Sequence, residues 1–73
     1  MKTYSHSDFQ VADATIGDVR VSTVWLHRDK DGHESYETMV FGGPLDQSCW
    51  RYATEREARK GHSAACALVQ AAR

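Results

Sequence analysis

Alternating apolar and polar positions divide the first three quarters of the chain into strand-like segments. Four segments carry this pattern: residues 9–16, 19–27, 35–41 and 48–53. The strongest is VRVSTVWLH, residues 19–27, which is dense in β-branched and aromatic side chains. Turn-forming residues separate the segments: Gly17-Asp18, Asp31-Gly32 and Gly42-Gly43-Pro44. The pattern predicts four consecutive antiparallel strands.

From residue 54 onward the apolar spacing becomes helical. Thr54 is a suitable N-cap, and Glu57 three residues later completes a capping box. Residues 54–73 contain no proline and six alanines. The predicted buried stripe consists of Ala58, Gly61, Ala65, Leu68 and Ala72, with Val69 beside it. Because glycine costs about 1 kcal/mol in a helix interior, Gly61 indicates a close approach of the helix to the sheet.

The predicted fold class is therefore α+β, in the order β-β-β-β-α, with one C-terminal helix packed on one face of a four-stranded antiparallel sheet. A chain of 73 residues allows one domain, residues 1–73. Within it we expect a frayed segment over residues 1–8, the sheet over residues 9–53 and the helix over residues 54–73.

Both faces of this sheet carry apolar side chains. A two-residue turn at Asp31-Gly32 pairs Lys30 with His33, and alternation then separates the side chains into two sets. One face carries Val24, Leu26, Met39 and Phe41, and the other carries Val19, Val21, Trp25, Tyr36 and Val40. A single helix covers one face only, and the pattern leaves open which.

An apolar face without a helix predicts a contact surface for a protein partner or a second copy. The expected partner-binding residues are Val21, Trp25, Tyr36 and Val40, with Glu34 and Glu37 at the rim. The alternatives are that the N-terminal segment folds over this face or that strong sheet twist hides it.

Charge is unevenly distributed along the chain, although its net value is −1. Residues 1–46 carry eight acidic and four basic side chains, whereas residues 47–73 carry two acidic and five basic ones. The near-neutral total argues against a dedicated nucleic-acid-binding module, which is expected to be strongly basic. An acidic sheet half could instead enter a basic protein groove that normally holds a nucleic-acid backbone.

Motifs for catalysis or metal binding are absent or incomplete. Aligning Gly32 with the glycine of a calcium loop places His27 and Thr38 at ligand positions, where both are unsuitable. Cys49, His62 and Cys66 together fall short of a zinc ligand set, and no glycine elbow accompanies either thiol. Gly42-Gly43 lacks the spacing of a phosphate-binding loop. We therefore expect no enzyme activity, no metal and no cofactor.

The expected cellular compartment also follows from features that the sequence lacks. No run of 18 apolar residues and no apolar signal region occur, so we expect no membrane span and a cytoplasmic location. Cys49 and Cys66 are then expected to be free thiols, the alternative being a single disulfide in a secreted protein.

Three motifs resemble a family of small accessory proteins encoded in phages, prophages and phage-like elements of bacteria. They are Val21-Ser22-Thr23-Val24-Trp25-Leu26, Glu37-Thr38-Met39-Val40-Phe41-Gly42-Gly43, and Tyr52-Ala53-Thr54 followed by Glu57-Ala58 and Gly61-His62. The resemblance covers about residues 19–66 and assigns no catalytic residue.

The phage context implies a stoichiometric inhibitor of a host defence complex in the host cytoplasm, such as an anti-CRISPR that blocks a CRISPR effector's access to nucleic acid. Two alternatives remain: a self-associating structural or assembly protein, and a regulator that contacts nucleic acid through Arg56, Arg59 and Lys60.

Overall fold

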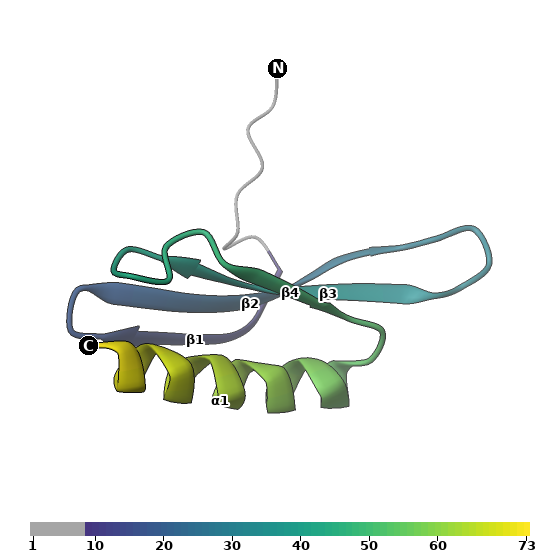
Figure 1. Cartoon of the computed structure of the whole chain (residues 1–73). Helices are drawn as coiled ribbons and strands as arrows, with labels where there is room; N and C mark the ends of the chain where they lie inside the picture. The colour runs from purple at the N-terminus through teal and green to yellow at the C-terminus, as the bar shows by residue number, and fades with distance from the viewer. Residues whose placement is uncertain (1–8) are drawn as a thin grey trace, which may run out of the picture.

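The computed structural model describes residues 9–73, so the predicted fraying of residues 1–8 lies outside the described residues. Five elements follow one another: β1 (Gln10–Ile16), β2 (Val19–Arg28), β3 (Glu34–Phe41), β4 (Cys49–Tyr52) and α1 (Glu55–Ala72). The strands form one antiparallel sheet in the order β1-β2-β3-β4, and α1 lies along one of its faces (Figure 1). The predicted β-β-β-β-α architecture is confirmed.

The predicted pairing of β2 with β3 is wrong by two residues up to Trp25, yet its side-chain faces are right over that stretch. Asp29 N donates to His33 O at 2.9 Å, so residues 30–32 form a three-residue loop in place of the expected two-residue turn. A bulge between Trp25 and His27 shifts the register once more, which places Trp25 opposite Tyr36. Side chains alternate with a period of two, so a total shift of two leaves the residues from Val19 to Trp25 on their predicted faces. Beyond the bulge the shift is one, so His27, predicted to lie opposite Tyr36, pairs with Ser35 on the other face.

The core lies between α1 and the face that carries the odd-numbered residues of β2. Val19, Val21 and Val40 contribute from the sheet, and Ala65 and Val69 from the helix. These side chains are small, so the helix approaches the sheet closely and each methyl group is a large fraction of the buried apolar surface.

The start of α1 follows the predicted capping chemistry. Thr54 has an extended backbone and its side chain accepts a hydrogen bond from Glu57 N at 3.1 Å. Thr54 Oγ1 in turn donates to Glu57 Oε1 at 3.2 Å. The cap satisfies a backbone N–H that the first helical turn would otherwise leave unpaired.

The predicted buried stripe of the helix is only partly right. Ala58, Ala65 and Val69 are buried. Leu68, expected in the core, is 50% exposed, and Ala72 is also exposed. Fewer helix positions contact the sheet than expected, because the valines of β2 and β3 fill the space directly under the helix axis.

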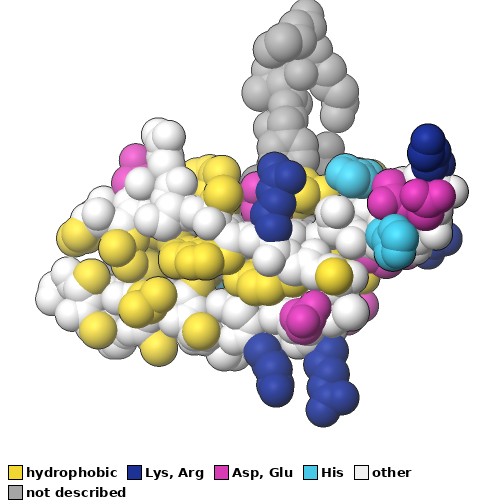
Figure 2. Space-filling view, turned by 45° about the vertical axis from the view of Figure 1, so that its right-hand side comes forward, with side chains coloured by type: hydrophobic (Ala, Val, Ile, Leu, Met, Phe, Trp, Pro, Cys, Tyr) yellow, Lys and Arg dark blue, Asp and Glu magenta, His cyan; other side chains and the backbone are white. Residues whose placement is uncertain are grey.

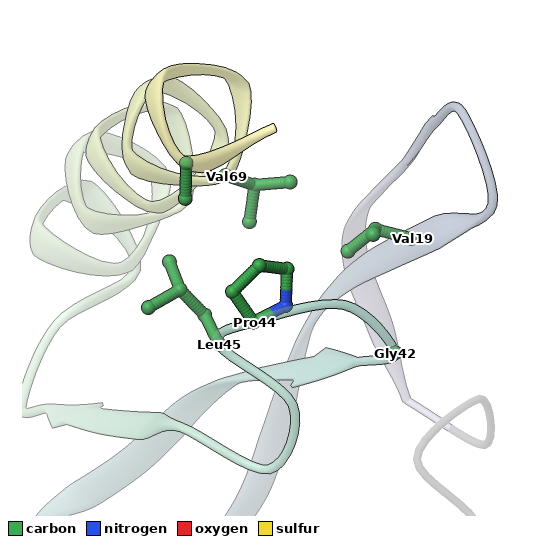
Figure 3. Close-up of a pocket in the computed structure, with 6 residues that line it drawn as sticks. Val19, Gly42, Pro44, Leu45 and Val69 are labelled. Carbon is green, nitrogen blue, oxygen red and sulfur yellow. The ribbon is translucent and has the colours of Figure 1, made fainter.

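The loop after β3 closes one end of the core. Gly43 has φ +70°, and a Cβ there would lie 2.7 Å from Val19 Cγ2, so glycine is required at this position. Figure 3 shows Pro44 and Leu45 reaching from the loop toward Val69 of α1. The crevice between them holds no space for a water molecule, so it is a packing seam rather than a ligand site.

Candidate functional site

The sheet face opposite α1 has no helix or second sheet over it among the described residues. We call this surface the open face and define it by Ser22, Val24, Leu26, Glu37, Met39, Phe41 and Arg51. Ser22 and Val24 are buried, while Leu26, Met39 and Phe41 are half-buried. A hollow of about 450 Å³ opens on it, lined by Leu26, His27, Glu37, Met39 and Arg51. The open face therefore combines part-exposed apolar side chains with a depression.

An ion pair lies beside this hollow. Arg51 Nε lies 3.3 Å from Glu37 Oε2, and the two residues are directly opposite each other on β4 and β3. The Glu37 side chain is 6% exposed and that of Arg51 is 67% exposed. Because the buried carboxylate has its counter-charge in place, a partner could cover the open face without burying an unpaired charge.

The hairpin joining β2 to β3 projects beyond the helix (Figure 1). Asp29 Oδ1 shapes its tip by accepting hydrogen bonds from the backbone N–H groups of Asp31 and His33, both at 2.9 Å. The His33 N–H, followed by that of Asp31, lowers the pKa of the Asp29 carboxyl, so this group stays ionised in mildly acidic solution. The tip presents two exposed carboxylates, Asp29 and Asp31, on a fixed turn.

Trp25 and Tyr36 lie opposite each other on the helix side of the sheet, and both are half-buried. The Trp25 ring meets Phe9 edge to face, with centroids 5.2 Å apart, and its Nε1 donates to Glu34 Oε1. This hydrogen bond, followed by that from Arg28, lowers the pKa of Glu34. Glu34 therefore holds the base of the hairpin together as well as carrying charge.

Val21 and Val40 do not lie on an accessible surface. Both have 0% exposure and both pack under α1. The expectation that they contact a partner is corrected by this burial, because the helix covers the face that carries them. Of the six expected contact residues, the structure leaves Trp25, Tyr36 and Glu34 half-buried near the hairpin and places Glu37 on the open face.

The cysteines lie on opposite sides of the sheet. Cys49 is exposed on β4, on the side of the open face, whereas Cys66 lies on α1; both are free thiols. Cys49, His62 and Cys66, which the sequence analysis weighs as an incomplete zinc ligand set, do not come together, because strand alternation points Cys49 away from the helix.

His62 instead joins a buried hydrogen-bonded chain. His62 Nδ1 lies 2.8 Å from Thr23 Oγ1, which lies 2.5 Å from Thr38 Oγ1, and His62 Nε2 lies 3.6 Å from Cys66 Sγ. Burial lowers the pKa of His62 and raises that of Cys66. The pair is thus a neutral imidazole and a protonated thiol, which is the opposite of an activated nucleophile. Sequence reasoning missed this chain because its members lie far apart along the sequence.

Three ligand-type side chains gather at the hairpin tip. The ligand atoms of Asp29, Asp31 and His33 lie within 4.8 Å of one another, and all three residues are exposed. Asp29 Oδ1 is already engaged by the turn, and its Oδ2 lies 3.4 Å from His33 Nδ1. These contacts account for the cluster as part of the turn.

Comparisons with protein-family models, with curated proteins and with solved structures find no match for this chain. Within residues 9–73, the single helix is too polar to cross a membrane. The candidate site is accordingly defined by the chain's own geometry: the open face with its hollow, and the hairpin beside it.

Proposed function

We propose that this protein is a non-enzymatic binding protein of phage origin that inhibits a host defence complex, such as a CRISPR effector, by blocking the path of its nucleic acid. The observation that carries the proposal is the open face, where Leu26 and Met39 border a hollow of about 450 Å³. The resemblance to phage-encoded accessory proteins supports the phage origin and the choice of target.

The apolar part of the open face would supply most of the contact energy. Leu26 and Met39 come from neighbouring strands and are half-buried, so the rigid sheet holds both in position before binding. Methionine also adapts its shape to a partner surface at low cost. The Glu37–Arg51 pair beside them needs no counter-charge from the target.

The hairpin would supply the electrostatic part. Asp29 and Asp31 are exposed at its tip, and the tip extends past the body of the domain (Figure 1). Carboxylates on a projecting loop can reach into a basic groove and compete there with phosphate groups. Half-buried Trp25, Tyr36 and Glu34 lie at the base of the hairpin on the helix side of the sheet, so a partner would contact them only where it encloses the projecting hairpin.

A pull-down from a host lysate, followed by quantitative binding, tests this proposal. Met39→Glu places a charge beside the hollow and should weaken the target complex by about tenfold or more. Ala67→Glu introduces the same charge on the exposed outer side of α1 and should leave the complex unchanged. Thermal melts of both variants establish that each remains folded.

The proposed competition with the target's nucleic acid is measured separately. Adding the protein to the purified target should reduce binding of the target's nucleic acid, and Asp31→Asn should lower the association rate and its dependence on salt. A target that binds the protein and its nucleic acid together, with equal affinity for the wild type and Met39→Glu, would refute the proposal.

A further inference from the structure

We infer that the outer edge of β4 and the flank of α1 beside it form a two-fold interface between two copies of this chain. The inference goes beyond the proposed function, because it concerns the edge of the sheet and the helix side rather than the open face.

The first observation is that β4 is an edge strand with outward hydrogen-bonding groups. Val40 N donates to Ser48 O at 3.0 Å, and β3 pairs with β4 in the same register. Antiparallel pairs alternate, so Trp50 and Tyr52 direct their backbone groups toward β3, while Cys49 and Arg51 direct theirs outward. Two N–H and two C=O groups are therefore presented along the edge of β4.

The second observation is an apolar groove directly beneath this edge. A hollow of about 230 Å³ is lined by Trp50, Tyr52, Gly61, Ala64, Ala65 and Leu68. Figure 2 shows hydrophobic side chains forming a band between the helix and the sheet above it. The groove exists because one helix, about 10 Å wide, cannot cover four strands spaced about 4.8 Å apart. Leu68, which is 50% exposed, lies at the rim of this groove.

A second copy fits both features at once. Pairing β4 with the partner's β4 around a two-fold axis at Trp50 sets Cys49 opposite the partner's Arg51, which gives four main-chain hydrogen bonds. The same two-fold axis orients the two copies of α1 antiparallel to each other. Leu68 then approaches the partner's Ala64, whose side chain is small. The hollow has room for about eight water molecules at about 30 Å³ each, which accommodates a four-carbon side chain.

The charge of Arg51 favours pairing centred on Trp50 over pairing centred on Arg51. A shift of the pairing by one step would set Arg51 directly opposite the partner's Arg51, which is repulsive. In the chosen register no charged residue of β4 faces its own kind. The last turn of α1 has no basic residue, and the Arg73 guanidinium that follows it lies against Gly17 at the β1–β2 turn, away from the β4 edge.

The opposite edge of the sheet is protected against such pairing. The β1–β2 register shifts between Gln10 and Ala12, and an irregularity of this kind disrupts an edge. Asp13, exposed on β1 and paired with Arg20, adds charge there. Nothing comparable interrupts the β3–β4 register over Cys49–Tyr52. The asymmetry selects β4 as the edge that associates.

The expected affinity follows from the size of the contact. The strip is about 27 Å long, the length of an 18-residue helix, and about 20 Å high, which gives roughly 500 Å² per copy. Standard interfaces bury about 800 Å² per partner, so this contact is smaller than the standard size and the dimer should be weak and concentration-dependent.

Light scattering over about a hundredfold range of wild-type concentration is the first test, since mass action makes a weak dimer concentration-dependent. The mass should rise from monomer to dimer. Leu68→Glu should weaken the dimer by about tenfold or more and remain folded, because Leu68 is half exposed. Gln70→Glu adds the same charge on the other flank of α1 and should leave the dimer unchanged.

Cross-linking tests the register. In a Cys49→Ser background, Trp50→Cys should form an intermolecular disulfide, since directly opposed residues of a non-hydrogen-bonded pair have Cα atoms about 4.5 Å apart. Thr15→Cys, exposed on the β1 edge, should not. If Trp50→Cys fails to fold, Arg51→Cys in a chain that retains Cys49 places the new thiol opposite the partner's Cys49.

A monomer at every concentration overturns the inference, as does a dimer that Leu68→Glu leaves intact. Equal cross-linking from the β1 and β4 edges also overturns it. Edge binding of a foreign extended peptide by a monomeric chain would assign the groove to a different occupant. Met39→Glu, which tests target binding on the open face, should leave the dimer unchanged, so the two proposals fail separately.

Discussion

At the scale of single residues, polar side chains hold the centre of the helix–sheet contact. Thr23 and Thr38 are both fully buried under α1, and their hydroxyl groups are hydrogen-bonded to each other. His62 reaches down from α1 to complete the chain. Burying these groups is tolerable only because each has a partner, and that requirement fixes how far α1 is rotated over the sheet.

His62 should make the stability of the fold depend on pH. Burial lowers its pKa in the folded state below the ordinary value of 6.5, so the unfolded chain binds more protons below about pH 6.5. The contribution of neutral His62 is therefore fully present above pH 6.5 and is lost as the pH falls through the folded pKa. Melting temperatures measured from pH 7.5 to 5 should fall for the wild type.

His62→Gln provides the control for this effect. Glutamine retains hydrogen-bonding capacity toward Thr23 and has no titration in this range, so its melting temperature should change less between pH 7.5 and 5. Parallel slopes for the wild type and the variant would assign the pH dependence to other groups. The lowered pKa values of Asp29 and Glu34 act in a separate window, below about pH 4.5.

At the scale of elements, the contact of α1 with β4 depends on Gly61. A Cβ at this position would overlap the ring of Tyr52, so the helix lies against the strand only because residue 61 has no side chain. The glycine also costs about 1 kcal/mol of helix stability relative to alanine. These two effects oppose each other and can be separated.

A double-mutant cycle should reveal this opposition. In the wild type, Gly61→Ala should lower the melting temperature or leave it unchanged, because the Tyr52 ring must move. In a Tyr52→Ala background the same substitution should stabilise the fold by up to about 1 kcal/mol, since only the helix propensity remains. Equal effects in both backgrounds would mean that the ring does not restrict residue 61.

Element order and side-chain faces could be predicted from sequence because they depend on local periodicity and capping. The alternation of VRVSTVWLH and the Thr54 N-cap are local signals, and both are confirmed. The Glu57 carboxylate accepts from the Thr54 hydroxyl group, in place of the backbone N–H that a capping box would use. The register was missed because the Asp29 side chain organises a three-residue loop and because the bulge at Leu26 leaves no mark in the pattern. The burial of Leu68 was overestimated because helical spacing alone does not give the width of the contact.

At the scale of the whole fold, the sheet has two apolar faces, and residues 9–73 supply one helix to cover them. Periodicity assigns Val40 and Met39 to different faces but does not say which face receives α1. The structure answers this through packing: the valines of β2 and β3 match the small residues of α1, while Leu26 and Met39 are left with the hollow. The sequence therefore predicted an apolar sheet face without a helix, as found within residues 9–73, but it placed Val21 and Val40 on that face although α1 covers them.

Val40→Ala and Met39→Ala should separate the two faces by experiment. Val40 is fully buried under α1, so losing two methyl groups should cost about 2 kcal/mol, a large share of the roughly 4–10 kcal/mol expected for a domain of this size. At about 4–8 °C per kcal/mol, its melting temperature should fall by about 8–16 °C.

Met39 is half-buried on the open face, so Met39→Ala should cost about 1 kcal/mol or less while weakening the target complex. The measurement is a thermal melt beside a binding titration for each variant, corrected for the unfolded fraction. A Val40→Ala variant that melts like the wild type would show that α1 does not cover this face, and an unchanged complex for Met39→Ala would remove Met39 from the contact surface.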